Sequence, residues 1–186
     1  MEKKEDNIMD DFWNKFCSFY HAPLIPMSDI PVPNHYGAYM QKRKHSVHTG
    51  IDLYAPEGSN VFAIESGRVV LKRIFTGPQD GTPWWNETWA VYIHGDTGTM
   101  CYGEILPESN IKEGIMVEGG QKIGTVIPVL KNDKGKATSM LHFALHSHGF
   151  ELMIQHNDLN DDARFYELQQ DPTLLLMQCK AKADRC

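Results

Sequence analysis

Long apolar runs are missing from this chain of 186 residues. No stretch approaches the ~20 consecutive apolar residues that a membrane-spanning helix requires, so we expect no membrane span. The first six residues are mostly charged and lead into no apolar segment, which argues against a secretory signal peptide. We therefore expect synthesis in the cytoplasm and, for any other destination, a route that needs no leader.

Positive charge is also scarce. The chain has 18 lysine and arginine residues against 24 aspartate and glutamate residues, so its formal net charge is −6 at pH 7. We expect no nucleic-acid partner, because binding to nucleic acid depends on neutralising phosphates. The same balance argues against simple electrostatic capture on an anionic membrane or cell wall. The one basic run, residues 42–45, is interpreted as a solvated loop.

Cysteines are few and scattered. The four of them, Cys17, Cys101, Cys179 and Cys186, show neither CxxC spacing nor clustering with histidines. This excludes zinc-knuckle and thiol-redox motifs. The pattern favours buried or free thiols over a disulfide framework.

The apolar content is sufficient for one domain with an added arm, since 41% of the residues are hydrophobic. Residues 1–34 are predicted to form an N-terminal arm. In it, apolar side chains recur at helical spacing over residues 6–21, and four prolines then make an extended connector. Residues 151–186 are predicted to form a tail that packs on the domain, with a short helix over residues 163–177.

Residues 35–150 carry a different pattern, with short β runs separated by turns. Residues 61–64 and 67–71 are predicted to pair with each other, and residues 88–94 and 100–106 to form a hairpin. Many strands with almost no helix between them predict a mainly β fold with an antiparallel sheet or sandwich core.

The most informative stretch runs from His48 to Asp52. Alternate side chains of an extended chain share a face, so His48, Gly50 and Asp52 point the same way, and Gly50 leaves room for an ion. His142 lies in an apolar run of strand character and could bring a second imidazole from a neighbouring strand. Two imidazoles and one carboxylate are a sufficient protein set for a catalytic zinc (Zn2+), which keeps a fourth position open for water.

Four motifs together resemble the lysostaphin-type zinc endopeptidase family, whose members cut peptide cross-links in bacterial peptidoglycan. Residues 48–58 (HTGIDLYAPEG) resemble the family's HxGIDLxAPxG signature, and residues 91–95 (VYIHG) its VxIxHG strand. Residues 118–124 (EGGQKIG) are similar to its VxxGQxIG turn, and residues 141–143 (LHF) to its HLHFE strand. The resemblance implies the fold of that family and a peptidoglycan peptide as substrate.

By the same resemblance the zinc ligands would be His48, Asp52 and His142. Two departures concern the family's other histidines, which are catalytic in typical members. Met140 stands where HLHFE has its first histidine, and Glu104 stands where the family's YxHL motif has its histidine.

Other residues could take over from those histidines. A carboxylate beside zinc is the base in other zinc peptidases, so Glu104 could accept the proton. A regular strand would place Tyr102 and Glu104 on one face. If the strand of His142 stays straight, His146 and His148 would lie on its face and one could donate a proton. The alternative is that both are solvated turn histidines.

Five further residues are candidates for a substrate groove. Trp84 and Trp85 lie in a long insertion rich in glycine and proline, and they could wall a groove for peptide or sugar or form a hydrophobic plug. Tyr36 and Tyr39 precede the ligand stretch and could supply an oxyanion donor or simply pack. His94 ends a strand and is expected to line the site as a structural hydrogen-bonding residue.

Two functions fit these observations. The first is a zinc metallopeptidase that cleaves peptidoglycan cross-links with a zinc-activated water. It would be a leaderless antibacterial toxin delivered to the periplasm or cell wall of a target cell, with a delivery or immunity protein as partner. The second is a catalytically degenerate, zinc-binding module that holds a ligand or regulates a partner. A metal-free structural protein is a third reading, and it leaves the two histidines and the aspartate unexplained.

Overall fold

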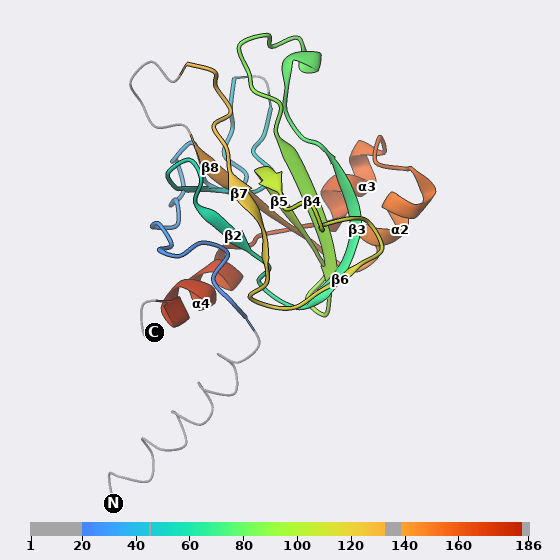
Figure 1. The fold of residues 1–186 in the computed structure, drawn as a ribbon. Coiled ribbons are helices and arrows are strands. Elements are labelled where there is room, and N and C mark those ends of the chain that lie inside the picture. Colours follow the sequence, from blue (N-terminus) through green and yellow to red (C-terminus); the bar gives the residue numbers. More distant parts are fainter. Residues whose placement is uncertain (1–19, 45, 133–138, 184–186) are drawn as a thin grey trace, which may run out of the picture.

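The computed structural model describes residues 20–44, 46–132 and 139–183 (Figure 1). Within these residues the strands are β1 (Ile51–Tyr54), β2 (Asn60–Phe62), β3 (Gly67–Ile74), β4 (Trp89–Gly95), β5 (Thr99–Pro107), β6 (Met116–Val117), β7 (Lys122–Val126), β8 (Met140–His146) and β9 (Gln169–Gln170). The helices are α2 (Phe150–His156), α3 (Asp162–Leu168) and α4 (Thr173–Ala183), with a 3-10 turn, η2 (Pro78–Asp80). None of these helices is long and apolar enough to cross a membrane.

The strand pairs of the described residues are all antiparallel, which confirms the predicted fold class. The main path through the sheet is β1–β8–β5–β4–β3–β6, while β7 pairs with β2 and β5, and β9 pairs with β8. The predicted hairpin is present as β4 and β5, whose turn is closed by the amide of Gly95 donating to the carbonyl of Gly98.

The predicted pairing of residues 61–64 with residues 67–71 is wrong. β2 pairs with β7, whereas β3 pairs with β4 and β6. After β2 the chain continues along the β6–β7 turn, because the amide of Ala63 donates to the carbonyl of Gln121 at 2.9 Å and the amide of Gly120 donates to the carbonyl of Ala63 at 2.8 Å. Backbone groups engaged there are unavailable for a hairpin between β2 and β3.

The two faces of the sheet are covered differently. One face carries the larger core, which includes Ile51 of β1, Tyr102 of β5, Phe143 of β8 and Leu176 of α4. The other face, which α2 and α3 cover, carries a smaller cluster. It consists of the strand residues Ala90, Tyr92, Cys101 and Ala144 together with Phe150 and Met153 of α2. Because side chains alternate along β8, His142 belongs to the same face as Ala144 of this second cluster.

The C-terminal tail contains more helix than the predicted segment over residues 163–177. It forms α2, α3 and α4; α3 ends at Leu168, and β9 followed by Asp171 and Pro172 separates it from α4. Proline has no amide hydrogen to continue a helix from the preceding turn. The carboxylate of Asp171 then accepts hydrogen bonds from the amide and the hydroxyl of Thr173, at 2.9 and 2.6 Å, which fixes the start of α4.

The predicted N-terminal helix over residues 6–21 falls mostly outside the described residues. Its last two members, Tyr20 and His21, are described and are not helical. The hydroxyl of Tyr20 shares a hydrogen bond with that of Thr97 at 3.0 Å, and the amide of His21 donates to the carbonyl of Ile64 at 2.7 Å. This end of the arm is therefore tied to the β domain.

Candidate metal centre

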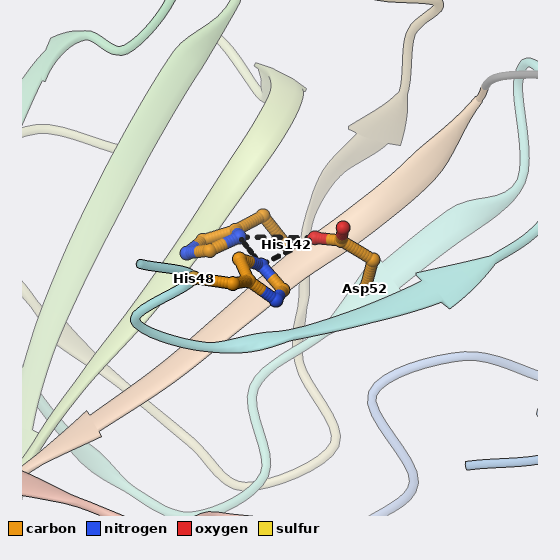
Figure 2. A group of neighbouring side chains, drawn as sticks. All are labelled: His48, Asp52 and His142. Carbon is orange, nitrogen blue, oxygen red and sulfur yellow. Dashed lines mark hydrogen bonds and ion pairs between the residues drawn. The ribbon is translucent and has the colours of Figure 1, made fainter. Parts of the chain in front are cut away.

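The three predicted ligand residues converge on one face of the sheet (Figure 2). Asp52 of β1 and His142 of β8 are direct cross-strand partners, and His48 lies just before β1. Asp52 Oδ1 is 3.0 Å from His48 Nε2 and 3.1 Å from His142 Nδ1, and these two nitrogens are 3.1 Å apart. All three residues are buried, and their candidate ligand atoms lie within 4.8 Å of one another. This donor set has the composition that zinc prefers.

The protonation states suit a metal ion. The carbonyl of Ala38 can only accept, so His48 donates to it through Nδ1–H at 2.9 Å and keeps the lone pair of Nε2 for the cluster. Burial lowers the pKa of His142, although Asp52 acts in the opposite direction. Burial also acts against the charge on Asp52, but hydrogen bonds with His142 and His48 hold its pKa well below the usual value. Metal binding needs a free imidazole lone pair and an ionised carboxylate, and the site provides both.

Gly50 is needed for this arrangement. A Cβ atom at that position would lie 2.5 Å from the carbonyl oxygen of Phe143 and 2.8 Å from Cε1 and Nε2 of His142. Any side chain would therefore displace either the pairing of β1 with β8 or the imidazole of His142. The sequence predicted that Gly50 leaves room for an ion, but the room beside Gly50 is occupied by the ring of His142.

A pocket of about 480 Å³ borders the three residues. Its lining also includes Glu104 of β5, Met140 of β8 and Trp85 from the insertion between β3 and β4. A backbone bridge joins Trp85 to Leu130, which holds the insertion against the segment after β7. The insertion thus forms one wall of the pocket, and Trp85 is a predicted groove residue that lines it.

Glu104 reaches the pocket because β5 is bulged there. Trp89 pairs with Ile105 and Val91 with Tyr102, so two residues of β5 lie opposite one residue of β4. Glu104 has a φ of 62°, in the left-handed region that few residues other than glycine adopt. The expectation that Tyr102 and Glu104 share a face is wrong, because the bulge leaves Tyr102 in the core and turns Glu104 into the pocket.

The carboxyl group of Glu104 is buried against two threonines. Its Oε2 accepts a hydrogen bond from the hydroxyl of Thr76 at 3.1 Å, and that hydroxyl also shares a 2.7 Å hydrogen bond with the hydroxyl of Thr88. Burial raises the pKa of Glu104 to about 7; the two threonines lower it and the charge of Asp52 adds to the rise. A carboxyl group with this pKa exchanges its proton near neutral pH, as a general acid or base must.

Arg43 is a residue of the site that the sequence pattern did not reveal. Its Nη2 lies 2.5 Å from Asp52 Oδ2, whereas both histidines approach Oδ1. The same guanidinium donates to the carbonyl of Tyr36, at 3.2 Å from Nε and 2.8 Å from Nη2. The basic run over residues 42–45 was interpreted as solvated, and no spacing rule links an arginine in a loop to a carboxylate nine residues later.

His146, His148 and His94 lie outside the lining of this pocket. β8 ends at His146, whose ring is 1% exposed and stacks on Phe150 of α2 with the ring centroids 3.7 Å apart. His148 is exposed and donates from Nε2 to the carbonyl of Asp96 at 3.0 Å, while its ring packs edge-on against His94, with centroids 5.3 Å apart. The C-terminal helices therefore close over the end of β8 where the sequence suggested an open row of histidines.

The remaining groove candidates are also outside the pocket lining. Tyr36 is 72% exposed and contributes its backbone carbonyl to Arg43. Tyr39 packs against the main core and borders a different cavity. Trp84 is 58% exposed and, unlike its neighbour Trp85, does not line the pocket.

Comparisons with known proteins were made for the whole chain. A family model described as "Peptidase family M23" matches residues 46–154, which is more than half of the chain. The antimicrobial peptidase lysostaphin from Staphylococcus simulans has 20% sequence identity and a TM-score of 0.52, over 87% of this chain and 55% of that chain. Its catalytic domain has 20% identity and a TM-score of 0.48, over 81% and 92% of the two chains. A zinc-containing peptidase from Vibrio cholerae has 20% identity and a TM-score of 0.48, over 68% of this chain and only 36% of that chain. A comparison with curated proteins gives no match.

Proposed function

Because the chain belongs to peptidase family M23, we propose that it is a zinc metallopeptidase that hydrolyses peptide cross-links of bacterial peptidoglycan. The observation that carries this proposal is the convergence of His48, Asp52 and His142 within 4.8 Å beside an open pocket. These three residues would hold the metal ion. A zinc ion bound there supplies a water molecule of lowered pKa and polarises the carbonyl group of a substrate.

Glu104 is assigned the transfer of protons. Its carboxylate accepts a proton from the attacking water and returns it to the leaving amine, so that one residue covers both steps. In the metal-free protein a pKa of about 7 populates both forms of this carboxyl group at neutral pH, and the positive charge of a bound zinc ion would favour the carboxylate that accepts the proton. The bulge of β5 and the hydroxyl of Thr76 hold this group toward the pocket. Glu104 thereby takes the place of the histidine found in the family's YxHL motif.

The oxyanion that develops on the substrate needs a hydrogen-bond donor, and we assign this role to Tyr54. Asp52 and Tyr54 are two residues apart in β1, so their side chains share a face, and Tyr54 lines the pocket. Burial and the charge of Asp52 raise the pKa of Tyr54, so its hydroxyl keeps its proton at neutral pH. A fixed donor in a partly enclosed pocket stabilises a developing negative oxygen.

The substrate assignment depends on the family resemblance and on the wall formed by Trp85. An aromatic side chain beside the metal site offers an apolar surface to a peptide stem. Delivery to the cell wall of a target cell, with an immunity or delivery protein as partner, stays a prediction.

The test is cleavage of purified peptidoglycan by the protein loaded with zinc, and again after chelation. Glu104→Gln should keep the zinc and the fold but lose at least about a hundredfold of activity, the scale of a lost general base. Glu118→Gln is the matched control, because Glu118 is exposed and lies outside the pocket. Full activity in Glu104→Gln would show that another group moves the proton.

Met140 favours a second function, that of a zinc-dependent binding module. It lines the pocket at the position where the family's HLHFE strand has a histidine. A thioether neither carries a proton nor donates a strong hydrogen bond. Wild-type protein that binds zinc and a peptidoglycan fragment, but cuts none of the cross-links tested, would favour this function over the peptidase.

A further inference from the structure

Arg43 is delivered to the site by a short hairpin that also carries His48. The amide of Met40 donates to the carbonyl of His48 at 2.8 Å, and the amide of His48 donates to the carbonyl of Gln41 at 2.9 Å. Nearer the turn, the amide of Arg43 donates to the carbonyl of Ser46 at 2.8 Å. A metal ligand and an arginine are therefore held on one small element, and both line the pocket.

The two oxygens of Asp52 have separate partners. Oδ1 faces the nitrogens of His48 and His142, at 3.0 and 3.1 Å. Oδ2 accepts from Nη2 of Arg43 at 2.5 Å. Since an aspartate side chain rotates easily about its last bond, a contact to the second oxygen is needed to hold the carboxylate plane with one oxygen toward the histidines.

We propose that Arg43 is a positioning residue that keeps Asp52 as a metal ligand through one oxygen. This inference takes from the proposed function only that His48, Asp52 and His142 bind a metal ion. A guanidinium is a planar fork that holds its partner in a fixed orientation, and this one is anchored from behind by the carbonyl of Tyr36. With Oδ2 engaged by Arg43, Asp52 would bind a metal ion through Oδ1 alone, and a coordination position would stay open for water or substrate.

The geometry favours this role over binding of a substrate carboxylate by Arg43. Nε and Nη2 are both engaged, by the carbonyl of Tyr36 and by Asp52. The side chain of Arg43 is 34% exposed, while that of Asp52 is 6% exposed, so the ion pair is shielded on the side of the ligand. A substrate carboxylate could bind in a paired contact to the Nε–Nη2 edge only by displacing Asp52 and the carbonyl of Tyr36.

The test compares Arg43→Met, Arg43→Lys and the control Arg68→Met in zinc affinity, measured by competition with a chromogenic chelator. Arg68 is a matched control, because its guanidinium also donates to a backbone carbonyl, that of Gly114 at 2.7 Å, at the opposite end of β3 from the pocket. Arg43→Met should lose about 10- to 100-fold in zinc affinity, as is typical when an outer-shell partner of a metal ligand is removed. Arg43→Lys should lose less, and Arg68→Met should match the wild type.

A second readout is the visible absorption of the Co2+-loaded protein. Chelation by both oxygens of Asp52 would raise the coordination number, and the Co2+ absorption bands weaken as it rises. The bands should therefore weaken in Arg43→Met and keep their intensity in Arg68→Met. A structural role in the hairpin alone would lower the unfolding temperature of the metal-free protein without this spectral change.

The inference is overturned if wild type and Arg43→Met have the same zinc affinity and the same Co2+ spectrum. If, in addition, the KM of Arg43→Met for substrate rises, Arg43 is a substrate-binding residue instead. If Arg43→Met does not fold, Arg43→Lys is the deciding variant. It should lose at least about threefold in zinc affinity, because an ammonium group cannot reproduce the planar fork of the guanidinium. Unchanged zinc affinity in Arg43→Lys would refute the positioning role. A wild type that binds zinc without cutting peptidoglycan would refute the peptidase and leave the Arg43 comparison intact.

Discussion

Replacing Glu104 by glutamine should remove a specific pH dependence from the stability of the metal-free protein. The residue is 7% exposed, and burial raises its pKa from 4.5 to about 7. Below pH 4.5 the carboxyl group is neutral in both the folded and the unfolded chain. As the pH rises from 4.5 to 7, the unfolded chain loses this proton while the folded chain keeps it, so stability falls. Above pH 7 the folded protein carries the full cost of a buried charge.

The size of the effect follows from the two pKa values. A difference between 4.5 and about 7 corresponds to a loss of about 3 kcal/mol in the free energy of unfolding at high pH. The hydrogen bond from Thr76 to the carboxylate is already included in that pKa. Glutamine carries no charge, so the stability of Glu104→Gln relative to wild type should rise by about 3 kcal/mol between pH 4.5 and pH 8.

The assay is urea unfolding of both proteins in the presence of a chelator at pH 4.5, 6 and 8. Over this range Asp52 stays ionised in both proteins, because its pKa is held well below the usual value, so the difference between the two curves reports the titration of Glu104. Glu118→Gln should run parallel to wild type, because Glu118 is exposed. If the free energy of unfolding of Glu104→Gln also changed with pH in parallel with that of wild type, the carboxyl group of Glu104 would be solvated, and the reasoning from its burial would be wrong.

Three further changes test the site and its surroundings. Gly50→Ala should abolish tight zinc binding in the competition assay and cost about 1–3 kcal/mol in urea unfolding, because the added Cβ meets the His142 ring at 2.8 Å. His146→Phe should raise the free energy of unfolding by about 1 kcal/mol and leave zinc affinity unchanged, because Nδ1 of this buried ring has no hydrogen-bond partner among the described residues. Trp85→Ala should raise KM for peptidoglycan fragments, whereas the exposed Trp84→Ala should change KM less; equal effects would contradict the placement of Trp85 in the pocket.

Much of the β architecture follows from local sequence signals. The turn at Gly95 to Gly98 sits between two runs of strand-forming residues, and the structure has the predicted hairpin there. His48 and Asp52 meet as the alternation suggested, but Gly50 is a bend and β1 begins only at Ile51, so one continuous pleat does not hold the two side chains. The identity of the partner strand came from the His142 motif, since alternation alone does not say which strands pair.

Features that depend on tertiary contacts could not be predicted in this way. The amide of Ala63 is bonded to the carbonyl of Gln121, a contact between distant segments that redirects β2 away from β3. The row of His142 and His146 along β8 was predicted as one face, but the stacking of Phe150 on His146 closes part of that face. In the first case a segment far away in the sequence decided the outcome, whereas in the second the chain turns into α2 directly after β8 and folds Phe150 back onto His146.

Glu104, which departs from one of the family's motifs, and Arg43, which motif reading missed, are linked by charge. A carboxylate at Glu104, in place of a histidine, puts a second acidic group near Asp52, and the charge of Asp52 raises the pKa of Glu104. The charge of Arg43 acts in the opposite direction on the same carboxyl group, and Arg43 also pairs with Asp52 directly. A histidine at position 104 would be neutral or cationic and would need no such compensation. The cation of Arg43 therefore helps to keep two carboxyl groups in one pocket, and Arg43→Met should raise the pKa of Glu104 further.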